Sequence, residues 1–244
     1  MARHGFVPRR NGVSAMNKML MLLASASGLA LAGEAAAAGH FTPRSTSTLL
    51  YDQSDSSGLA KYAVPSWAND SSFIPYSTPD LAADDFVIPG TGTHTVTAVY
   101  AAGVGSYQSW VNVIFFSTLK YNKQTGTTTA IVKATCSGMP FTDESGTGDL
   151  LVDVSSCDSG TFNGGHDYAV SVQPESPGGI WYWQTNRQRI GRPGFWYDYG
   201  GGGSGSCYTQ LTPVKICFPT KGYGPDLAFA IYGTNSDDDR GARR

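Results

Sequence analysis

Aromatic and arginine side chains are concentrated in one short segment of the chain, residues 181–199. This segment holds three of the five tryptophans, four further aromatic residues and three arginines. Aromatic faces stack on sugar rings, and guanidinium groups pair with carboxylates or sulfates. We therefore expect a partly exposed platform that binds a neutral or anionic polysaccharide. Its candidate ligand-binding residues are Tyr182, Arg187, Arg189, Arg192, Trp196, Tyr197 and Tyr199.

A structural role for the same segment is the alternative. Trp181 and Trp183 alternate with Tyr182 along a strand-like run, so both indoles would face a core while the tyrosine faces outward. Arginines in the following loop would then pack their stems on aromatic rings without binding any ligand. The core position is favoured for the two tryptophans, and both interpretations stay open for the loop aromatics.

Four aspartates form a second group that could do chemistry. They are Asp52, Asp84, Asp85 and Asp226, which are far apart in sequence but could meet if the first and last strands of a sheet are neighbours. Calcium binds through carboxylate and carbonyl oxygens, so a structural calcium ion is our hypothesis for this group. No D-x-D-x-D-G loop supports it, and turn capping, surface ion pairs or exposure to solvent is the alternative.

Residues that could catalyse a reaction are sparse. The sequence contains no G-x-S-x-G elbow, no H-E-x-x-H helix and no phosphate-binding loop. After residue 38 the histidines are His40, His94 and His166. A triad assembled from distant loops, or two carboxylates across a cleft, would still be possible chemistry. We expect a non-catalytic protein and keep an unrecognised hydrolase as an alternative.

The elements that position these residues are predicted to be strands. Short runs rich in Val, Ile, Thr, Tyr and Phe recur between Gly, Pro, Asn, Asp and Ser clusters, and helical periodicity is not sustained. Residues 110–116 carry apolar side chains on both faces, which predicts a central strand. The predicted fold class is all-β, an antiparallel β-sandwich of jelly-roll type in a single domain with two disulfides. Strands are predicted at 47–51, 85–88, 95–101, 110–116, 127–134, 150–154, 168–172, 180–183 and 227–232.

The four cysteines are Cys136, Cys157, Cys207 and Cys217. Pairing in sequence order, Cys136 with Cys157 and Cys207 with Cys217, closes short loops and would staple hairpins. A metal site is the competing interpretation, but the sequence has neither C-x-x-C spacing nor clustered histidines. We expect two disulfides, which form in an oxidising compartment.

The N-terminal region has the features of a secretory leader. Four basic residues precede an apolar run that begins at Met19, and a series of small residues ends at Ala38. We interpret residues 1–38 as a signal peptide, with translation beginning at Met1 or at Met16. The apolar run is too short to cross a bilayer, so the processed protein is expected to be secreted or periplasmic, without a membrane anchor.

The rest of the chain is interpreted as one domain. The glycine-rich tract near residue 200 is followed by two cysteines and a convincing strand, which favours a loop within a domain over a boundary. The last residues carry three aspartates and no large apolar side chain. The predicted organisation is a signal peptide at 1–38, an N-terminal segment at 39–44, a β-sandwich domain at 45–234 and a disordered tail at 235–244.

The charge balance excludes one class of partner. The chain has 17 Lys and Arg against 19 Asp and Glu, a net charge of −2. Removing residues 1–38 takes away four basic residues and one acidic residue, so 13 basic and 18 acidic residues remain and the net charge becomes about −5. Nucleic-acid binding needs a concentrated basic face, so that class is not expected. The sequence does not indicate an oligomeric state.

Four short motifs resemble a family of uncharacterised β-sandwich domains in exported bacterial proteins. They are Tyr-Asp-Gln at 51–53, Ala-Asp-Asp-Phe at 83–86, Gly-Gly-Ile-Trp-Tyr-Trp at 178–183 and Pro-Asp-Leu-Ala-Phe-Ala-Ile-Tyr-Gly at 225–233. The resemblance spans nearly the whole chain after the leader. It implies a β-sandwich that occurs alone or attached to secreted enzymes, surface anchors and other extracellular modules, with no agreed catalytic residues. This chain departs from many such domains in lacking a C-terminal sorting segment, so surface attachment is not expected.

Together these features predict a secreted, non-catalytic β-sandwich module that binds a glycan or a cell-envelope polysaccharide. A structural or adhesive extracellular protein with a protein partner is the second interpretation, and an unrecognised secreted hydrolase is the third. An exposed aromatic strip would favour glycan binding. A cleft in which two carboxylates, or a serine and a histidine, converge would favour the hydrolase.

Overall fold

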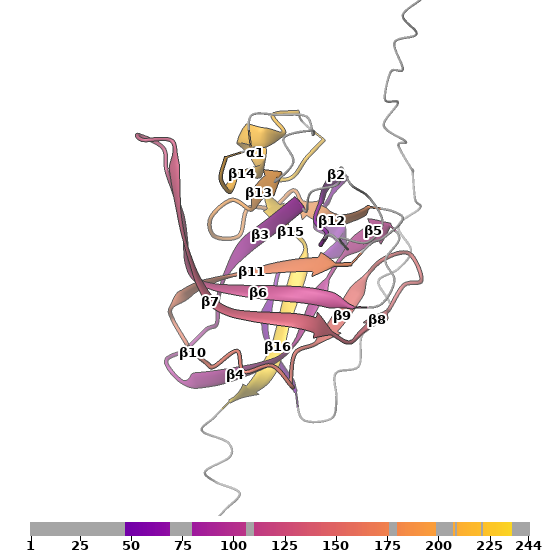
Figure 1. Cartoon of the computed structure of the whole chain (residues 1–244), viewed down its shortest axis with the longest axis vertical. Coiled ribbons are helices and arrows are strands. Elements are labelled where there is room, and N and C mark those ends of the chain that lie inside the picture. The colour runs from indigo at the N-terminus through magenta and orange to yellow at the C-terminus, as the bar shows by residue number, and fades with distance from the viewer. Residues whose placement is uncertain are drawn as a thin grey trace, which may run out of the picture. The chain divides into compact units, whose positions relative to one another are not determined.

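The structure is a computed structural model. It describes residues 47–68, 80–105, 110–175, 180–198, 207, 209–220 and 222–235. Runs of β-branched and aromatic residues form antiparallel sheets, joined by turns rich in Gly, Asn and Asp (Figure 1). Among the described residues, the helical elements are a single 3-10 turn, η1 (Ser56–Gly58), and one turn of α-helix, α1 (Val214–Cys217). The predicted all-β class is confirmed.

Two main sheets face each other in this fold. One has the strand order β1-β16-β4-β9-β8, with β10 beside β4, and the other has the order β14-β13-β3-β11-β6-β7. The first sheet contains β1 (Thr48–Asp52), β16 (Phe229–Asn235), β4 (Thr93–Ala101), β9 (Leu150–Asp153), β8 (Phe141–Asp143) and β10 (Thr161–Asn163). The second contains β14 (Thr212–Pro213), β13 (Phe195–Asp198), β3 (Asp80–Val87), β11 (Asp167–Pro174), β6 (Val111–Asn122) and β7 (Thr127–Met139).

The strand order is that of a jelly roll. In chain order, the principal strands are β1, β3, β4, β6, β7, β9, β11 and β16. β1, β16, β4 and β9 lie side by side in one sheet, and β3, β11, β6 and β7 lie side by side in the other. If the eight strands are numbered along the chain, these orders are 1-8-3-6 and 2-7-4-5. Two interlocked Greek keys give this arrangement. The predicted antiparallel sandwich of jelly-roll type is therefore confirmed.

A smaller sheet continues the sandwich at one end. It contains β15 (Asp226–Leu227), β12 (Trp181–Asn186), β2 (Leu59–Pro65) and β5 (Gly103–Gly105). The chain passes from β4 to β5 at Ala102 and from β15 to β16 at Ala228. The Ala102 N–H donates to the Ala228 carbonyl at 3.0 Å, and the Gln184 N–H on β12 donates to the Ala102 carbonyl at 2.9 Å. These bonds join β12 to the main sandwich at the point where two of its strands are interrupted.

Apolar side chains cover both faces of the second sheet. Along β11, Tyr168, Val170 and Val172 face the core between the main sheets, where aromatic rings such as Phe115 and Phe162 contact each other with centroids 5.2 Å apart. A second cluster lies on the opposite face of that sheet. It contains Ala83, Phe116, Leu119, Ala169, Phe195 and Leu211, and we refer to it as the outer cluster.

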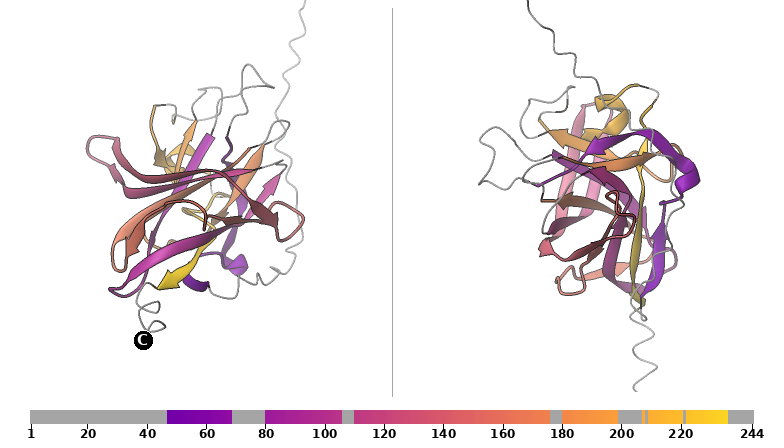
Figure 2. Two further views of the ribbon diagram at one scale, coloured as in Figure 1. Left: turned by 60° about the horizontal axis from the view of Figure 1, so that its bottom comes forward. Right: turned by 90° about the vertical axis from the view of Figure 1, so that its right-hand side faces the viewer.

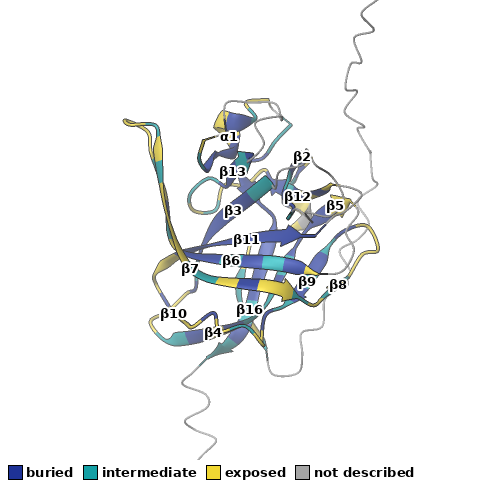
Figure 3. Cartoon of the chain, viewed as in Figure 1, coloured by how far each residue is buried: buried dark blue, intermediate teal, exposed yellow. Residues whose placement is uncertain are grey.

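The strand β6 is central, as its sequence predicts. It lies between β11 and β7 and contributes to the cluster on each face, whereas β7 is largely exposed (Figure 3). Trp110, included in the predicted strand, precedes β6 and is 46% exposed. Beyond the sandwich, β6 and β7 continue as a long hairpin (Figure 2).

Both disulfides join the cysteines in sequence order, as predicted. Cys136 pairs with Cys157 and Cys207 pairs with Cys217. The first does not staple a hairpin, because Cys136 lies on β7 of the second sheet and Cys157 follows β9 of the first. It ties the two sheets together, and a loop of this length contributes about 3 kcal/mol in the chain-entropy picture. The second disulfide fixes α1 to residue 207.

Each predicted strand has a counterpart, but the boundaries and several short strands differ. β3 begins at Asp80, before the predicted start at residue 85, and β13 lies in a segment that was interpreted as a loop. Most of the missed strands are short or contain Gly, Lys and Pro, which weaken the β signal, whereas β13 has three aromatic residues but is only four residues long. They are β2, β5, β8, β10, β13 and β14.

Several predicted segments lie outside the described residues. These are the signal peptide at 1–38, the segment at 39–44, Tyr199 and all of the predicted tail except Asn235. Asn235 belongs to β16 and pairs with His94 on β4, so the strand runs one residue past the predicted end of the domain at residue 234. Within the described part of the chain, no helix has the length and apolarity of a membrane span.

Candidate functional site

The structure separates residues that the sequence grouped as one platform. Tyr182 on β12 is 37% exposed, and Arg187 and Arg189, which follow the strand, are exposed. Trp181 and Trp183 are fully buried, which confirms the core position predicted for them.

Trp196 is buried, so the prediction that it belongs to an exposed platform is wrong. Its side chain is 2% exposed, and its indole N–H donates to the Pro65 carbonyl at 2.9 Å. Side chains alternate along β13, so Trp196 faces the main core while Phe195 and Tyr197 face the outer cluster. Tyr197 is half-buried there, and it is not grouped with Tyr182.

Trp196 is connected to the surface by a row of aromatic side chains. Its ring lies 4.8 Å from that of Phe218, Phe218 stacks on Tyr223 at 4.6 Å, and Tyr223 contacts Tyr62 on β2 at 5.1 Å between ring centroids. We refer to Trp196, Phe218, Tyr223 and Tyr62 as the aromatic row. Because its inner end is a buried indole, the row fixes the position of Tyr62 at the surface.

An open hollow lies at the outer end of the aromatic row. Its volume is about 490 Å³, and it is widely open to solvent. β2, the loop after β12 and the segment after α1 each contribute to its lining. We refer to it as the tyrosine hollow, and the residues that line it are Lys61, Tyr62, Arg187, Thr220 and Gly222.

Backbone contacts hold the walls of the tyrosine hollow together. The Tyr62 N–H donates to the Gly222 carbonyl at 3.0 Å, and the Lys215 ammonium donates to the Tyr223 carbonyl at 2.7 Å. A Cβ at Gly222 would lie 1.9 Å from the Tyr62 ring, so a larger residue could not approach so closely. The wall after α1 is therefore fixed against β2.

Tyrosines and positive charge meet at the hollow. The Lys61 ammonium lies 5.2 Å from the centre of the Tyr62 ring. Burial raises the pKa of Tyr223, and Tyr62 and Tyr182 raise it further, so Tyr223 stays neutral. Within the described chain, the lining includes two cations and no acidic side chain, and neither Lys61 nor Arg187 has an ion-pair partner.

Three of the four predicted aspartates meet and are shielded from solvent. Asp84, Asp85 and Asp226 are 0%, 4% and 0% exposed, and we refer to them as the buried acid cluster. Asp84 accepts hydrogen bonds from the Gln53 side-chain amide at 2.8 Å and from the Leu227 N–H at 2.6 Å. The Asp85 N–H donates to the other oxygen of Asp84 at 2.9 Å. Backbone and amide donors thus surround this carboxyl group.

The segment 187–194 closes over the buried acid cluster. Its Ile190 N–H donates to Asp226, and its Arg192 N–H donates to Asp85 at 2.9 Å. The other oxygen of Asp226 is buried and has no hydrogen-bond partner in the described structure. Two carboxyl groups thereby position a loop whose arginines are predicted to bind a ligand.

Burial and mutual repulsion favour the protonated form of these carboxyl groups. Burial, with the charge of Asp85, raises the pKa of Asp226 to about 7, and burial raises the pKa of Asp85 to about 6. Burial, then the charges of Asp226 and Asp85, raise the pKa of Asp84 well above its ordinary value. The cluster therefore retains protons near neutral pH, and its enclosure keeps a polymeric substrate away from it.

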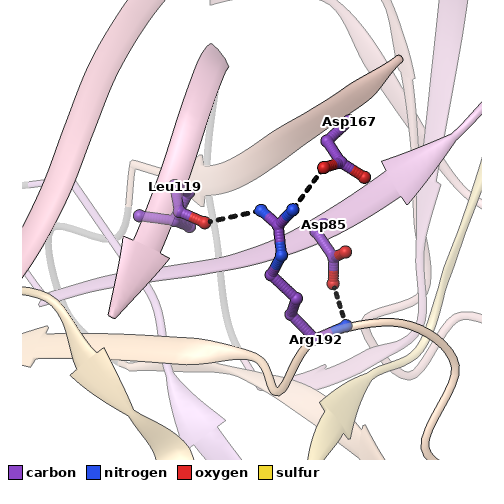
Figure 4. A network of polar contacts seen from close by, with 4 residues as sticks. All are labelled: Asp85, Leu119, Asp167 and Arg192. Carbon is purple, nitrogen blue, oxygen red and sulfur yellow. Dashed lines mark hydrogen bonds and ion pairs between the residues drawn. The ribbon is translucent and has the colours of Figure 1, made fainter. Parts of the chain in front are cut away.

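The Arg192 side chain binds other residues of the fold and does not line the tyrosine hollow. Its guanidinium donates to the Leu119 carbonyl at 3.3 Å and forms an ion pair with Asp167, while its backbone reaches Asp85 (Figure 4). These contacts tie segment 187–194 to β6, β11 and β3. Arg189 bonds within its own loop, to the Gly191 carbonyl at 3.2 Å. Of the three predicted arginines, the structure thus brings only Arg187 to the tyrosine hollow.

Asp52 lies apart from the buried acid cluster. It is exposed, and its carboxylate accepts hydrogen bonds from the Ser54 N–H at 2.8 Å and the Ser54 hydroxyl at 2.6 Å. The predicted four-aspartate calcium site is therefore not assembled, and turn capping is the role of Asp52. Across the described residues, no three or more His, Cys, Asp or Glu side chains are grouped so as to hold a metal ion.

Comparison of the sequence with protein-family models gave no match, and comparison with curated proteins gave none. The resemblance to exported β-sandwich domains therefore stays a prediction. Its motifs do have a shared physical role, because Tyr51 donates to Gln53 at 2.6 Å and Gln53 donates to Asp84 and, at 2.7 Å, to the Leu227 carbonyl. Three of the four motifs thus meet in one buried network that stabilises the fold.

Most of the tyrosine hollow was missed from the sequence. Lys61 and Tyr62 lie on β2, which was not predicted as a strand, and Thr220 and Gly222 lie in an irregular segment. Tyr223 between Gly222 and Gly224 was the available signal. Nothing in that signal joins the segment to β2, because the contact is made only by the folded chain.

Proposed function

We propose that this protein is a secreted, non-catalytic carbohydrate-binding module that holds a polysaccharide at the tyrosine hollow. The proposal rests on one observation: Tyr62, whose ring contacts Tyr223, lines an open hollow of about 490 Å³, and the exposed Tyr182 lies on the neighbouring strand β12. Tyrosine rings stack on sugar rings, and their hydroxyls donate to and accept from sugar hydroxyls. A rigid, partly apolar surface of this kind suits a ligand that carries alternating apolar faces and hydroxyl groups.

Export is part of the proposal. Two disulfides with no free cysteine among the described residues are typical of proteins that fold in an oxidising compartment. The predicted leader at 1–38 would direct the chain there. Polysaccharides are abundant outside the cytoplasm, so ligand and protein would occupy the same space.

Binding without cleavage follows from the position of the acids. Glycoside hydrolysis uses two carboxyl groups on either side of the scissile bond. The described lining of the hollow contains no carboxyl group, and the carboxyl groups of the buried acid cluster are enclosed beneath segment 187–194. A sugar chain in the hollow would therefore find rings, hydroxyls and cations but no acid–base pair.

The test is retention of the exported, disulfide-bonded protein on immobilised polysaccharides in affinity electrophoresis. Tyr182→Ala and Tyr62→Ala should each weaken retention about five- to tenfold, since one aromatic contact is worth roughly 1 kcal/mol beyond its area. Tyr121→Ala is the matched control, because Tyr121 packs against the outer cluster and does not line the hollow.

Melting curves separate binding from folding in this test. Tyr182 is exposed, so Tyr182→Ala should melt as the unmodified protein does. Equal retention of Tyr182→Ala, Tyr62→Ala and the unmodified protein would contradict the proposal. So would a lack of retention on every polysaccharide of a panel that includes neutral and acidic polymers.

A further inference from the structure

We infer that the ligand of the tyrosine hollow is an acidic polysaccharide, whose carboxylate or sulfate group is held between Lys61 and Arg187. This inference rests on the proposed function and names the chemical class of its ligand. It follows from where the positive charges of the described chain lie and from which of them already have partners.

The tyrosine hollow is positively charged, whereas the chain as a whole is negatively charged. The whole chain has a net charge of −2, yet the described lining of the hollow has two cations and no anion. Two other described cations are already engaged: Lys215 donates to backbone carbonyls, and Arg192 forms an ion pair with Asp167. Lys61 and Arg187 are exposed and have no ion-pair partner in the described residues. They are therefore available to an anionic ligand.

The backbone brings these two cations to the same place. Asn186 on β12 pairs with Leu59 on β2, and the next residue, Arg187, donates its N–H to the Gly58 carbonyl at 2.7 Å. Arg187 is thereby fixed beside the start of β2, the strand that carries Lys61. Their side chains reach one hollow from adjacent segments, so a single ligand group can contact both.

The chemistry of the two side chains selects an acid group. A guanidinium forms two parallel hydrogen bonds with a carboxylate or a sulfate, and an ammonium adds a point charge. Hydrogen bonds to an ionised acceptor are about twice as strong as those between neutral groups. With the Tyr62 ring beside Lys61, one sugar unit can stack on the tyrosine while its acid group reaches the cations. A neutral sugar would use the tyrosines alone.

The experiment compares three polymers with the exported, disulfide-bonded protein: polygalacturonate, dextran sulfate and unmodified dextran. We expect retention on at least one acidic polymer to exceed retention on dextran at least about tenfold. Retention on polygalacturonate alone assigns a carboxylate, and retention on dextran sulfate alone assigns a sulfate. Added salt should weaken the interaction, because exposed charges are screened.

The decisive variant is Lys61→Gln with Arg187→Gln. It should lower retention on the acidic polymer at least about tenfold without changing the melting curve, because both side chains are exposed. The matched control is Lys120→Gln with Lys123→Gln, which removes the same charge from the exposed part of the β6–β7 hairpin. It should retain the acidic polymer as the unmodified protein does.

The outcomes distinguish this inference from the proposed function. Equal losses in the two double variants, or equal binding of double-stranded DNA, would show unspecific ion exchange and overturn the inference. Equal retention on dextran and on both acidic polymers, with Tyr182→Ala still weakening all three, would overturn the inference while leaving carbohydrate binding in place. Absence of retention on all three polymers would overturn the inference, whereas the proposed function is decided by the wider panel.

Discussion

The tyrosine hollow and the buried acid cluster are two regions with charged side chains, and they differ in whether those side chains are exposed to solvent. The hollow places Lys61 and Arg187 in solvent, without ion-pair partners in the described chain. The cluster removes Asp84, Asp85 and Asp226 from solvent and surrounds them with backbone donors. A single segment, 187–194, contributes to both regions. Arg187 lines the hollow, whereas Ile190 and Arg192 donate hydrogen bonds to the cluster.

The difference shows that burial decides what a charged group does in this protein. An exposed cation keeps its hydration until a ligand arrives, so its removal should change binding and leave stability unchanged. A buried carboxyl group must be protonated or bonded, because an unpaired charge in the interior is costly. Its replacement should change stability and the dependence of stability on pH. The predictions below use this contrast.

The largest expected effect is at the inner end of the aromatic row. Trp196→Ala should lower the free energy of unfolding by about 3–5 kcal/mol, as emptied aromatic core sites do. The residue is 2% exposed, and its indole N–H is bonded to Pro65. Urea denaturation measures the loss, and Tyr182→Ala, at an exposed position on β12, should lose no more than about 0.5 kcal/mol. Equal stabilities of the two variants would show that the row is not anchored in the core.

The second prediction concerns pH. Folding raises the pKa of Asp226 from 3.8 to about 7 and that of Asp85 to about 6, so the folded state binds protons more tightly than the unfolded state. Their contribution to stability is complete below about pH 4 and is lost as the pH rises through 6 and 7. Asp80, whose pKa burial raises to about 7, acts in the same sense. The free energy of unfolding should therefore be larger at pH 5 than at pH 8.

Asp226→Asn is the variant that sharpens this prediction. The oxygen of the introduced amide can still accept the hydrogen bond from the Ile190 N–H. The substitution removes the negative charge of a carboxylate whose other oxygen has no hydrogen-bond partner in the described structure. At pH 8 the variant should be more stable than the unmodified protein by roughly 1–3 kcal/mol, since each pKa unit corresponds to about 1.4 kcal/mol. At pH 5 the gain should shrink. A stability that rises from pH 5 to pH 8 would contradict this account of the cluster.

A smaller effect is expected at the ion pair that holds segment 187–194. The side chains of Arg192 and Asp167 are 32% and 44% exposed, so solvent screens their attraction. Arg192→Gln should therefore lower the free energy of unfolding by no more than about 1 kcal/mol, and added salt should reduce the difference. A loss as large as that of Trp196→Ala would mean that the segment depends on the guanidinium more than on its backbone bonds to Asp85 and Asp226.

The smallest effect is expected from removing calcium. Asp52 caps its own turn and lies apart from the buried acid cluster, so the four aspartates do not surround one position. Differential scanning calorimetry in excess calcium and in chelator should give the same Tm. A Tm several degrees higher in calcium would show that an ion bound only to the folded state contributes to stability.

Much of the fold could be predicted because its signals are local. Alternating apolar residues in 168–172 fix which side of β11 faces the core, and the short loops between cysteines favour the observed disulfides. The burial of Trp196 could not be predicted from local patterns. The run Phe195-Trp196-Tyr197 alternates in either of two senses, and only the sheet that β13 joins decides that the tryptophan is the one facing inward.

The sequence by itself determined the β-sandwich class, and it favoured the observed disulfide pairing and the burial of Trp181 and Trp183, since these follow from period-two patterns and short loops. The tertiary structure alone decided that Tyr62 meets Tyr223, that Arg187 reaches solvent beside Lys61, and that Arg192 is bound to Asp167. The physical reason is that these contacts join strands and loops far apart in the chain, and no local pattern specifies which distant segment a side chain will meet.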